Sequence, residues 1–156
     1  MLDEKLLACI ETAIGREEEA FNFYTDLAGQ VADESARETI QWIATEEKKH
    51  KAFLLKFRDK GKGPKGLRET DVVYYKLAEY LEEPEVSDNI RREEIFLLAA
   101  HRELRSFNFY TDLAALYSEG SEIHEMLQRM ANEELKHKEK MEYLYANTSF
   151  PQTDGG

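Results

Sequence analysis

Two Glu-x-x-His motifs are the groups in this sequence best suited to bind metal ions. They run from Glu47 to His50 and from Glu134 to His137. Residues three positions apart on a helix project to the same side, so the carboxylate and the imidazole of one motif can bind a single ion. One such motif would be weak evidence in a chain rich in glutamate. Two motifs in matching contexts are strong evidence for a metal site.

One eight-residue segment occurs twice in the chain, with one copy before each motif. A further glutamate precedes each copy. The segment Phe21–Ala28 recurs letter for letter as Phe107–Ala114, and a glutamate lies seven residues before the tyrosine of each copy. The repeat indicates a duplicated two-helix unit, in which each unit supplies two carboxylates and one imidazole. The candidate ligands for two metal ions are therefore Glu17, Glu47, His50, Glu103, Glu134 and His137.

The surroundings of Glu17 distinguish it from an ordinary surface acid. Apolar residues flank it on the same helical face, among them Ile10, Ile14 and Phe21, and Glu103 lies in a similar stripe. A buried carboxylate is unfavourable unless it is protonated, paired with a cation or bound to metal. The predicted core faces offer almost no Lys or Arg, whereas two divalent ions would balance four carboxylates.

Glu46, next to Glu47, and Glu133, next to Glu134, are alternative ligands, because each lies one turn before a motif histidine. Glu46 turns partly toward Trp42, so we favour Glu47 and Glu134. A carboxylate-rich ligand set without sulfur suits iron or manganese, and zinc also accepts histidine. We expect two metal ions per chain, with iron favoured over manganese or zinc.

Four further side chains lie near these motifs or share their chemistry. Tyr24 and Tyr110 follow the first glutamate of each unit by two turns on the same face. They fit two roles, core aromatics or hydrogen-bond donors to a ligand carboxylate, and both can hold at once. His101 and His124 have no counterpart in the other unit, so we expect them to serve surface or packing roles.

The elements that must position these residues are four long helices. Apolar residues recur at three- and four-residue spacing, and turn-forming residues interrupt them. This pattern predicts an all-α fold, a four-helix bundle of two duplicated helical hairpins joined by a long crossover with a short helix. The expected parts are a single domain at 1–147, with hairpins at 3–60 and 90–146, a crossover at 61–89 with its helix within 69–82, and a flexible tail at 148–156.

The register of each predicted hairpin places its ligands at one height. The midpoint between Glu17 and Glu47 is residue 32, and that between Glu103 and Glu134 lies between residues 118 and 119, both in predicted turns. A helix rises about 1.5 Å per residue, so equal numbers of residues up and down return the chain to the same level. The units are offset by 86 residues (103 − 17) and 87 residues (134 − 47), which places one extra residue in the second turn. Either a one-crossover or an up-down-up-down order fits.

The composition excludes several classes of partner. The chain has 21 Lys and Arg against 32 Asp and Glu, a formal charge of −11, which argues against nucleic acid or an anionic membrane. Its apolar runs are too short to span a bilayer, and its first residues lack the pattern of a signal peptide. The single cysteine, Cys9, cannot form an internal disulfide and fits helix packing. We expect a cytoplasmic protein.

The paired motifs resemble those of the ferritin-like diiron carboxylate proteins, and among these the rubrerythrins. The superfamily pattern is one glutamate from each of two helices and Glu-x-x-His from each of the other two. The resemblance covers about residues 4–146. It implies a ferritin-like bundle in which the six candidate residues are the metal ligands, with Glu47 and Glu134 bridging the two ions. The first helix, with Glu17, Ala20 and Tyr24, is the part most similar to a rubrerythrin.

Two departures bear on the activity that the resemblance implies. Rubrerythrins commonly carry an extra glutamate one turn after the third-helix ligand, where this chain has Ser106, and a rubredoxin domain with two Cys-x-x-Cys pairs, where this chain has one cysteine. We therefore expect a non-haem diiron oxidoreductase that reduces hydrogen peroxide or dioxygen with electrons from a separate, rubredoxin-type carrier. A homodimer is expected. The alternatives are an iron-oxidising storage or delivery protein and a non-redox zinc- or manganese-binding protein.

Overall fold

The structure, a computed structural model, describes residues 4–60, 76–87 and 90–149. By its internal contacts the chain divides into two compact units, Met1–Gly66 and Leu67–Gly156. The described residues form five α-helices and include no β-strand. Among the described helices, none has both the length and the apolar character that crossing a membrane requires. The prediction of one domain at 1–147 is left untested and stays a prediction.

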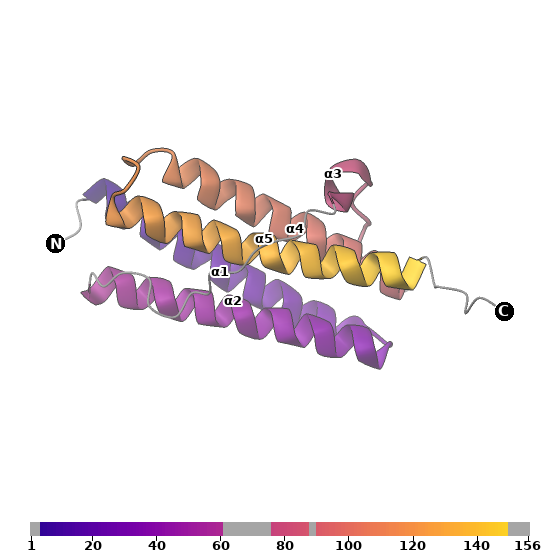
Figure 1. The fold of residues 1–156 in the computed structure, drawn as a ribbon. Helices are drawn as coiled ribbons and strands as arrows, with labels where there is room; N and C mark the ends of the chain where they lie inside the picture. The colour runs from indigo at the N-terminus through magenta and orange to yellow at the C-terminus, as the bar shows by residue number, and fades with distance from the viewer. Residues whose placement is uncertain (1–3, 61–75, 88–89, 150–156) are drawn as a thin grey trace. The chain divides into compact units, whose positions relative to one another are not determined.

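The first unit is a helical hairpin of α1 (Glu4–Gln30) and α2 (Glu34–Lys60), which run side by side in opposite directions (Figure 1). Buried apolar side chains at helical spacing line both helices, such as Ile10 and Leu27 on α1 and Ile43 and Leu54 on α2. Asp33 begins the second helix, because its carboxylate accepts a hydrogen bond of 2.9 Å from the Ala36 N–H. This side chain thus helps to set where α2 starts.

The second unit contains α3 (Leu77–Tyr80), α4 (Arg92–Ala114) and α5 (Glu122–Ser149). Ser121 caps α5, since its hydroxyl accepts a hydrogen bond of 3.2 Å from the His124 N–H. A ring nitrogen of His124 lies 2.8 Å from the Ala114 carbonyl oxygen, at the end of α4. His124 therefore serves the turn between the two helices, in agreement with the packing role predicted for it.

The two hairpins differ mainly in their turns. The first turn comprises residues 31–33, and the second comprises residues 115–121. Gly120 has a φ of 82° there, a left-handed conformation that glycine adopts readily. The longer turn replaces the last part of α4 and the first part of α5, so the ligand-bearing stretches keep their register. The extra residue of the second unit lies in this turn, as predicted.

The described part of the crossover is anchored to the second unit. Glu83 accepts two hydrogen bonds from the Arg105 guanidinium, at 2.8 and 3.0 Å, and Glu79 forms an ion pair of 2.8 Å with Lys138 of α5. The predicted short helix corresponds to the single turn of α3, and residues 61–75 and 88–89 of the predicted crossover lie outside the described residues. Helix α5 extends to Ser149, beyond the predicted end at 146, and the rest of the predicted tail, 150–156, lies outside the described residues.

Candidate metal centre

The first hairpin brings its three predicted ligands together. Glu17 projects from α1 and Glu47 and His50 from α2, and all three are at most 3% exposed. The Nδ1 atom of His50 lies 3.8 Å from an oxygen of each carboxylate. One ligand atom from each residue lies within 4.8 Å of the others. One helix of the hairpin therefore supplies a single glutamate and the other supplies the Glu-x-x-His motif, as predicted from the repeat.

The second hairpin repeats this arrangement. Glu103 comes from α4, and Glu134 and His137 come from α5, with exposures of 1%, 0% and 3%. The Nδ1 atom of His137 lies 3.8 Å from a Glu103 oxygen, the same separation as in the first hairpin. Their ligand atoms also lie within 4.8 Å of one another. Equal spacing of the ligands from the turn thus brings them to one level in both units.

The geometry of each cluster fits a metal ion. Metal–ligand bonds of about 2.0 to 2.2 Å place two ligand atoms no more than about 4.4 Å apart. Separations of up to 4.8 Å need only small side-chain adjustments. Carboxylate oxygen and imidazole nitrogen are the donors that iron, manganese and zinc accept. That the six residues bind metal stays a prediction.

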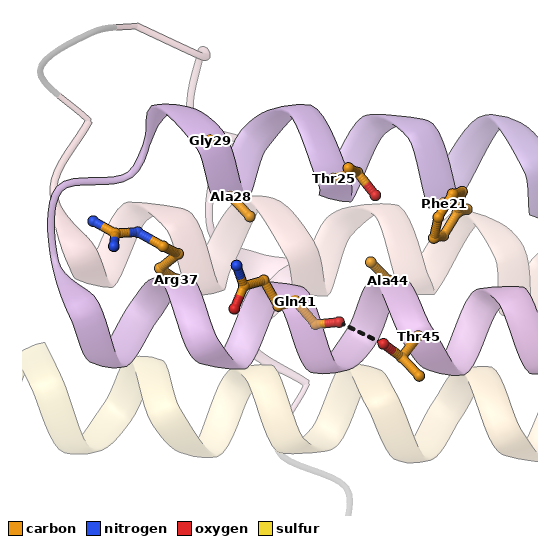
Figure 2. Close-up of a pocket in the computed structure, with 8 residues that line it drawn as sticks. All are labelled: Phe21, Thr25, Ala28, Gly29, Arg37, Gln41, Ala44 and Thr45. Atoms are coloured by element: carbon orange, nitrogen blue, oxygen red, sulfur yellow. Dashed lines mark hydrogen bonds between the residues drawn. The ribbon is translucent and has the colours of Figure 1, made fainter.

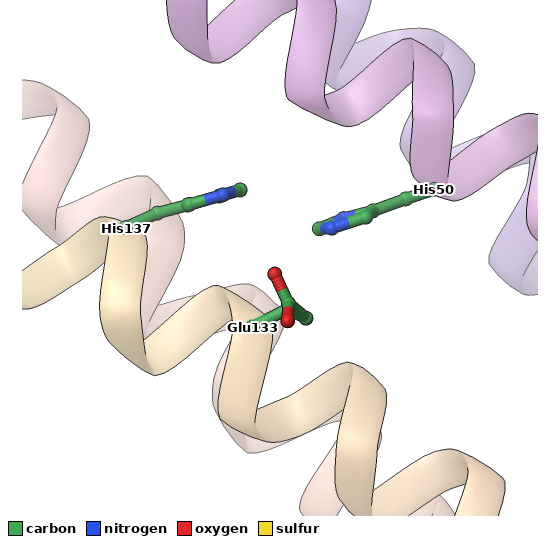
Figure 3. Close-up of side chains that lie close together, drawn as sticks. All are labelled: His50, Glu133 and His137. Atoms are coloured by element: carbon green, nitrogen blue, oxygen red, sulfur yellow. The ribbon is translucent and has the colours of Figure 1, made fainter. Parts of the chain in front are cut away.

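The alternative ligands have other partners. Glu46 keeps 19% of its side chain exposed and pairs with Lys49 at 2.9 Å, whereas Glu47 is 1% exposed. Glu133 is more buried, and it pairs with Lys136 at 3.2 Å. Figure 3 shows Glu133 and His137 projecting from α5, where Glu133 lies one turn before the histidine. The choice of Glu47 over Glu46 as a ligand stays a prediction, and Glu133 is the more buried of the two alternatives.

The repeated tyrosines are both buried and share one contact. Tyr24 and Tyr110 are each 1% exposed. Tyr24 packs edge-on against Phe23 with ring centroids 5.5 Å apart, and Tyr110 packs in the same way against Phe109 at 5.1 Å. The packing role is therefore present in both units. A hydrogen bond from either hydroxyl to a ligand carboxylate stays a prediction.

His101, the other histidine without a counterpart in the repeat, lies half-buried on α4.

A buried cation, Lys138, is the feature that the sequence did not predict. Its side chain is 2% exposed, and its ammonium pairs with Glu142, with Glu79 at 2.8 Å and with Glu139 at 3.4 Å. Burial by itself lowers the pKa of Lys138, but hydrogen bonds to Glu142 and Glu79 outweigh it and hold the pKa above its ordinary value. The i, i+4 spacing of Lys138 and Glu142 was the available signal, although it is also typical of surface pairs.

The first hairpin also carries an open groove of about 540 Å³ between α1 and α2 (Figure 2). Phe21, Gln41 and Thr45 are among its lining residues, and none of the six predicted ligands is. Its one charged lining residue, Arg37, donates hydrogen bonds to the Val31 carbonyl at 3.1 and 3.2 Å and so stabilises the turn. The groove is therefore separate from the candidate ligands of this hairpin.

Comparisons with known proteins agree with this arrangement. The Rubrerythrin family profile matches residues 8–95, more than half of the 156 residues. A solved structure of a hypothetical protein from Pyrococcus furiosus is 26% identical, with a TM-score of 0.63, over 95% of this chain and 92% of that one. No curated protein matches. The all-α, ferritin-like fold expected from the sequence is thus confirmed, and the chain belongs to the rubrerythrin family.

Proposed function

We propose that this protein is a non-haem diiron oxidoreductase that reduces hydrogen peroxide, or dioxygen, with electrons from a separate carrier. The six residues that would hold the ions are Glu17, Glu47, His50, Glu103, Glu134 and His137. The observation that carries the proposal is the duplication of one buried cluster, two carboxylates and an imidazole, in both hairpins. Membership of the rubrerythrin family supports a metal-binding role.

The charges of these clusters explain why metal is the expected occupant. Each cluster holds two carboxylates in side chains that are almost fully buried. Buried carboxylates are costly unless cations or hydrogen bonds compensate for the lost water. Two divalent ions would supply the charge that four carboxylates require. Glu47 and Glu134, each on the helix that also carries the histidine, are the residues that we propose bridge the ions.

The protein would contribute three properties to the reaction. The carboxylates and imidazoles hold their donor atoms in place from two helices in each hairpin, so little reorganisation is needed on binding. Burial keeps bulk water away from these donors. Tyr24 and Tyr110, buried on the helices that carry Glu17 and Glu103, would position a carboxylate through their hydroxyls. When bound, a pair of ferrous ions supplies the two electrons that cleavage of one peroxide O–O bond consumes.

We propose that the electrons come from a separate carrier. The sequence contains one cysteine, Cys9, and so cannot form the two Cys-x-x-Cys pairs of a rubredoxin domain. A rubredoxin-type protein, which carries one electron at a time, is the class of donor that we propose. Two transfers would restore the reduced state after each peroxide.

Titration of the reduced protein tests this function. The iron-loaded full chain is reduced without oxygen and mixed with peroxide or with air-saturated buffer, and oxidation is followed by absorbance. We expect about one peroxide to be consumed per chain, faster than the reaction with air, and no consumption by Glu134→Ala. Faster oxidation by air with ferric iron accumulating beyond two per chain would support iron storage or delivery. Purified protein that holds zinc or manganese and is inert to peroxide would support a non-redox role.

A further inference from the structure

The second unit contains a third group of carboxylates, distinct from the six predicted ligands. Glu79 of α3 and Glu139 and Glu142 of α5 all form ion pairs with Lys138. The Glu142 side chain is fully buried and that of Glu139 is 7% exposed, whereas Glu79 is 31% exposed. Three carboxylates therefore converge on one nitrogen atom that is itself almost inaccessible to water.

The cation that these three carboxylates surround is the side-chain ammonium of Lys138. An ammonium has three N–H donors, and here it faces three carboxylates. The Leu77 N–H also donates to Glu142 and holds one of its oxygens in place. With the lysine present the formal charge of the group is −2 (three carboxylates against one ammonium), so a divalent ion would balance it better than the lysine does. The lysine is tethered, however, and competes with free ions at high effective concentration.

We propose that Lys138 is a specificity residue, whose ammonium fills the group formed by Glu79, Glu139 and Glu142 and thereby excludes metal ions from it. This would confine metal to the ligands that include imidazole. An all-oxygen site suits hard ions such as Mn²⁺ or Ca²⁺ and would not select for iron. The proposed function enters this inference at one point, the two ions that the unaltered chain is expected to bind.

Removal of the ammonium should convert this group into a cation site. Bonds from Ca²⁺ to oxygen are about 2.3 to 2.6 Å and those of smaller hard ions are shorter. The present distances from the Lys138 nitrogen are 2.8 Å to Glu79 and 3.4 Å to Glu139, so the oxygens would have to move inward by up to about 1 Å. Glu79 lies on a four-residue helix and is the least buried of the three, which makes this movement feasible.

The test counts Mn²⁺ ions bound by Lys138→Met and by the unaltered full chain, from the electron paramagnetic resonance signal of free Mn²⁺. Methionine matches the unbranched lysine side chain as far as Cε and lacks the charged nitrogen beyond it. We expect Lys138→Met to bind one ion more per chain than the unaltered protein. Lys138→Arg, which keeps the charge, and Lys140→Met, at an exposed position on the same helix, should show no increase. Adding Glu142→Gln to Lys138→Met should abolish the additional ion.

Three outcomes would overturn the proposal. An equal count in Lys138→Met and the unaltered protein would show that the lysine does not exclude metal, whatever the total. An increase in Lys140→Met as large as in Lys138→Met would assign the effect to net charge alone. If Lys138→Met lacks helical circular dichroism without added ions, Mn²⁺ should restore it, and failure to do so would contradict a cation site. A chain that binds no Mn²⁺ before substitution would contradict the two-ion function, while the difference between variants would still test this inference.

Discussion

The imidazole of His50 lies 3.8 Å from a carboxylate oxygen of Glu17, on the other helix of its hairpin. The same separation joins His137 and Glu103 in the second hairpin. Such agreement follows from the register, because Glu17 and Glu47 lie at nearly equal distances from their turn, as do Glu103 and Glu134, and each histidine follows its glutamate by three residues. The cap residues Asp33 and Ser121 fix where the second helix of each hairpin begins, so they contribute to that register.

Separate replacement of the adjacent residues Glu46 and Glu47 on α2 should show which of the two binds metal. Glu47→Ala should lose both metal ions, because the bridging role expected from the family resemblance makes it a ligand of each. Glu46→Ala is the matched control, since it removes a partly exposed carboxylate paired with Lys49, and should keep full metal content. Elemental analysis of the two purified variants measures this. Loss of metal in Glu46→Ala with retention in Glu47→Ala would show that the assigned register is wrong by one residue.

Removal of metal should lower the thermal stability of the protein. A ligand present at 100 times its dissociation constant stabilises the folded state by about 2.7 kcal/mol, which corresponds to roughly 5 to 10 °C for a chain of this size. The melting temperature, followed by circular dichroism before and after chelation, should fall by at least that amount. The chelator should not shift the melting temperature of Glu47→Ala. An unchanged melting temperature of the chelated protein would indicate that metal does not stabilise the fold.

The sequence predicted the helices and the ligand clusters because both depend on short-range periodicity. The spacing from Glu17 to the turn and back to Glu47 determines their level, and the burial of Ile10 and Leu54 follows from the apolar stripe. Such features can be derived from helical geometry without knowledge of distant contacts. The same regularity placed the extra residue of the second unit in its turn.

The environment of Lys138 could not be derived in this way. Its ammonium pairs with Glu79, which is far away in the sequence and belongs to the short helix of the crossover. A lysine that lies beside a predicted ligand and four residues before a glutamate has the pattern of a solvated surface pair. Two interactions with α3 lie outside that spacing: the ion pair of Glu79 with Lys138 and the hydrogen bond from the Leu77 N–H to Glu142. The expectation that the core faces hold almost no Lys or Arg did not identify this position.

The ion pair of Glu83 and Arg105 should stabilise the second unit in a pH-dependent way. The hydrogen bonds from Arg105 hold the pKa of Glu83 below its ordinary value of 4.5. A lowered pKa contributes stability above pH 4.5, and this contribution is lost as the pH falls through the lowered value. Because the pair is partly exposed, Arg105→Ala should cost no more than about 1 kcal/mol at pH 7.

Denaturant unfolding at pH 7 and near pH 3 measures this dependence. The difference between the unaltered protein and Arg105→Ala should shrink as the pH falls toward the lowered pKa of Glu83. Arg91→Ala is a suitable control, because Arg91 is an exposed arginine that pairs with Glu93 and Glu94. A difference that grows on acidification would contradict the assigned ion pair.

The rate of peroxide reduction should depend on the residue at position 106. Ser106 is half-buried on α4, three residues after Glu103, where rubrerythrins commonly have an additional glutamate. Positions three apart project to one side of a helix, so Ser106→Glu would bring a third carboxylate toward Glu103 and Glu134 of the second hairpin. We expect slower peroxide reduction by the unaltered protein than by rubrerythrins with that glutamate, and a several-fold increase in Ser106→Glu. Ser106→Gln, of nearly equal size but neutral, separates charge from bulk, and stopped-flow oxidation of the reduced proteins compares all three. Equal rates in the Glu and Gln variants would show that the carboxylate at this position does not promote the reaction.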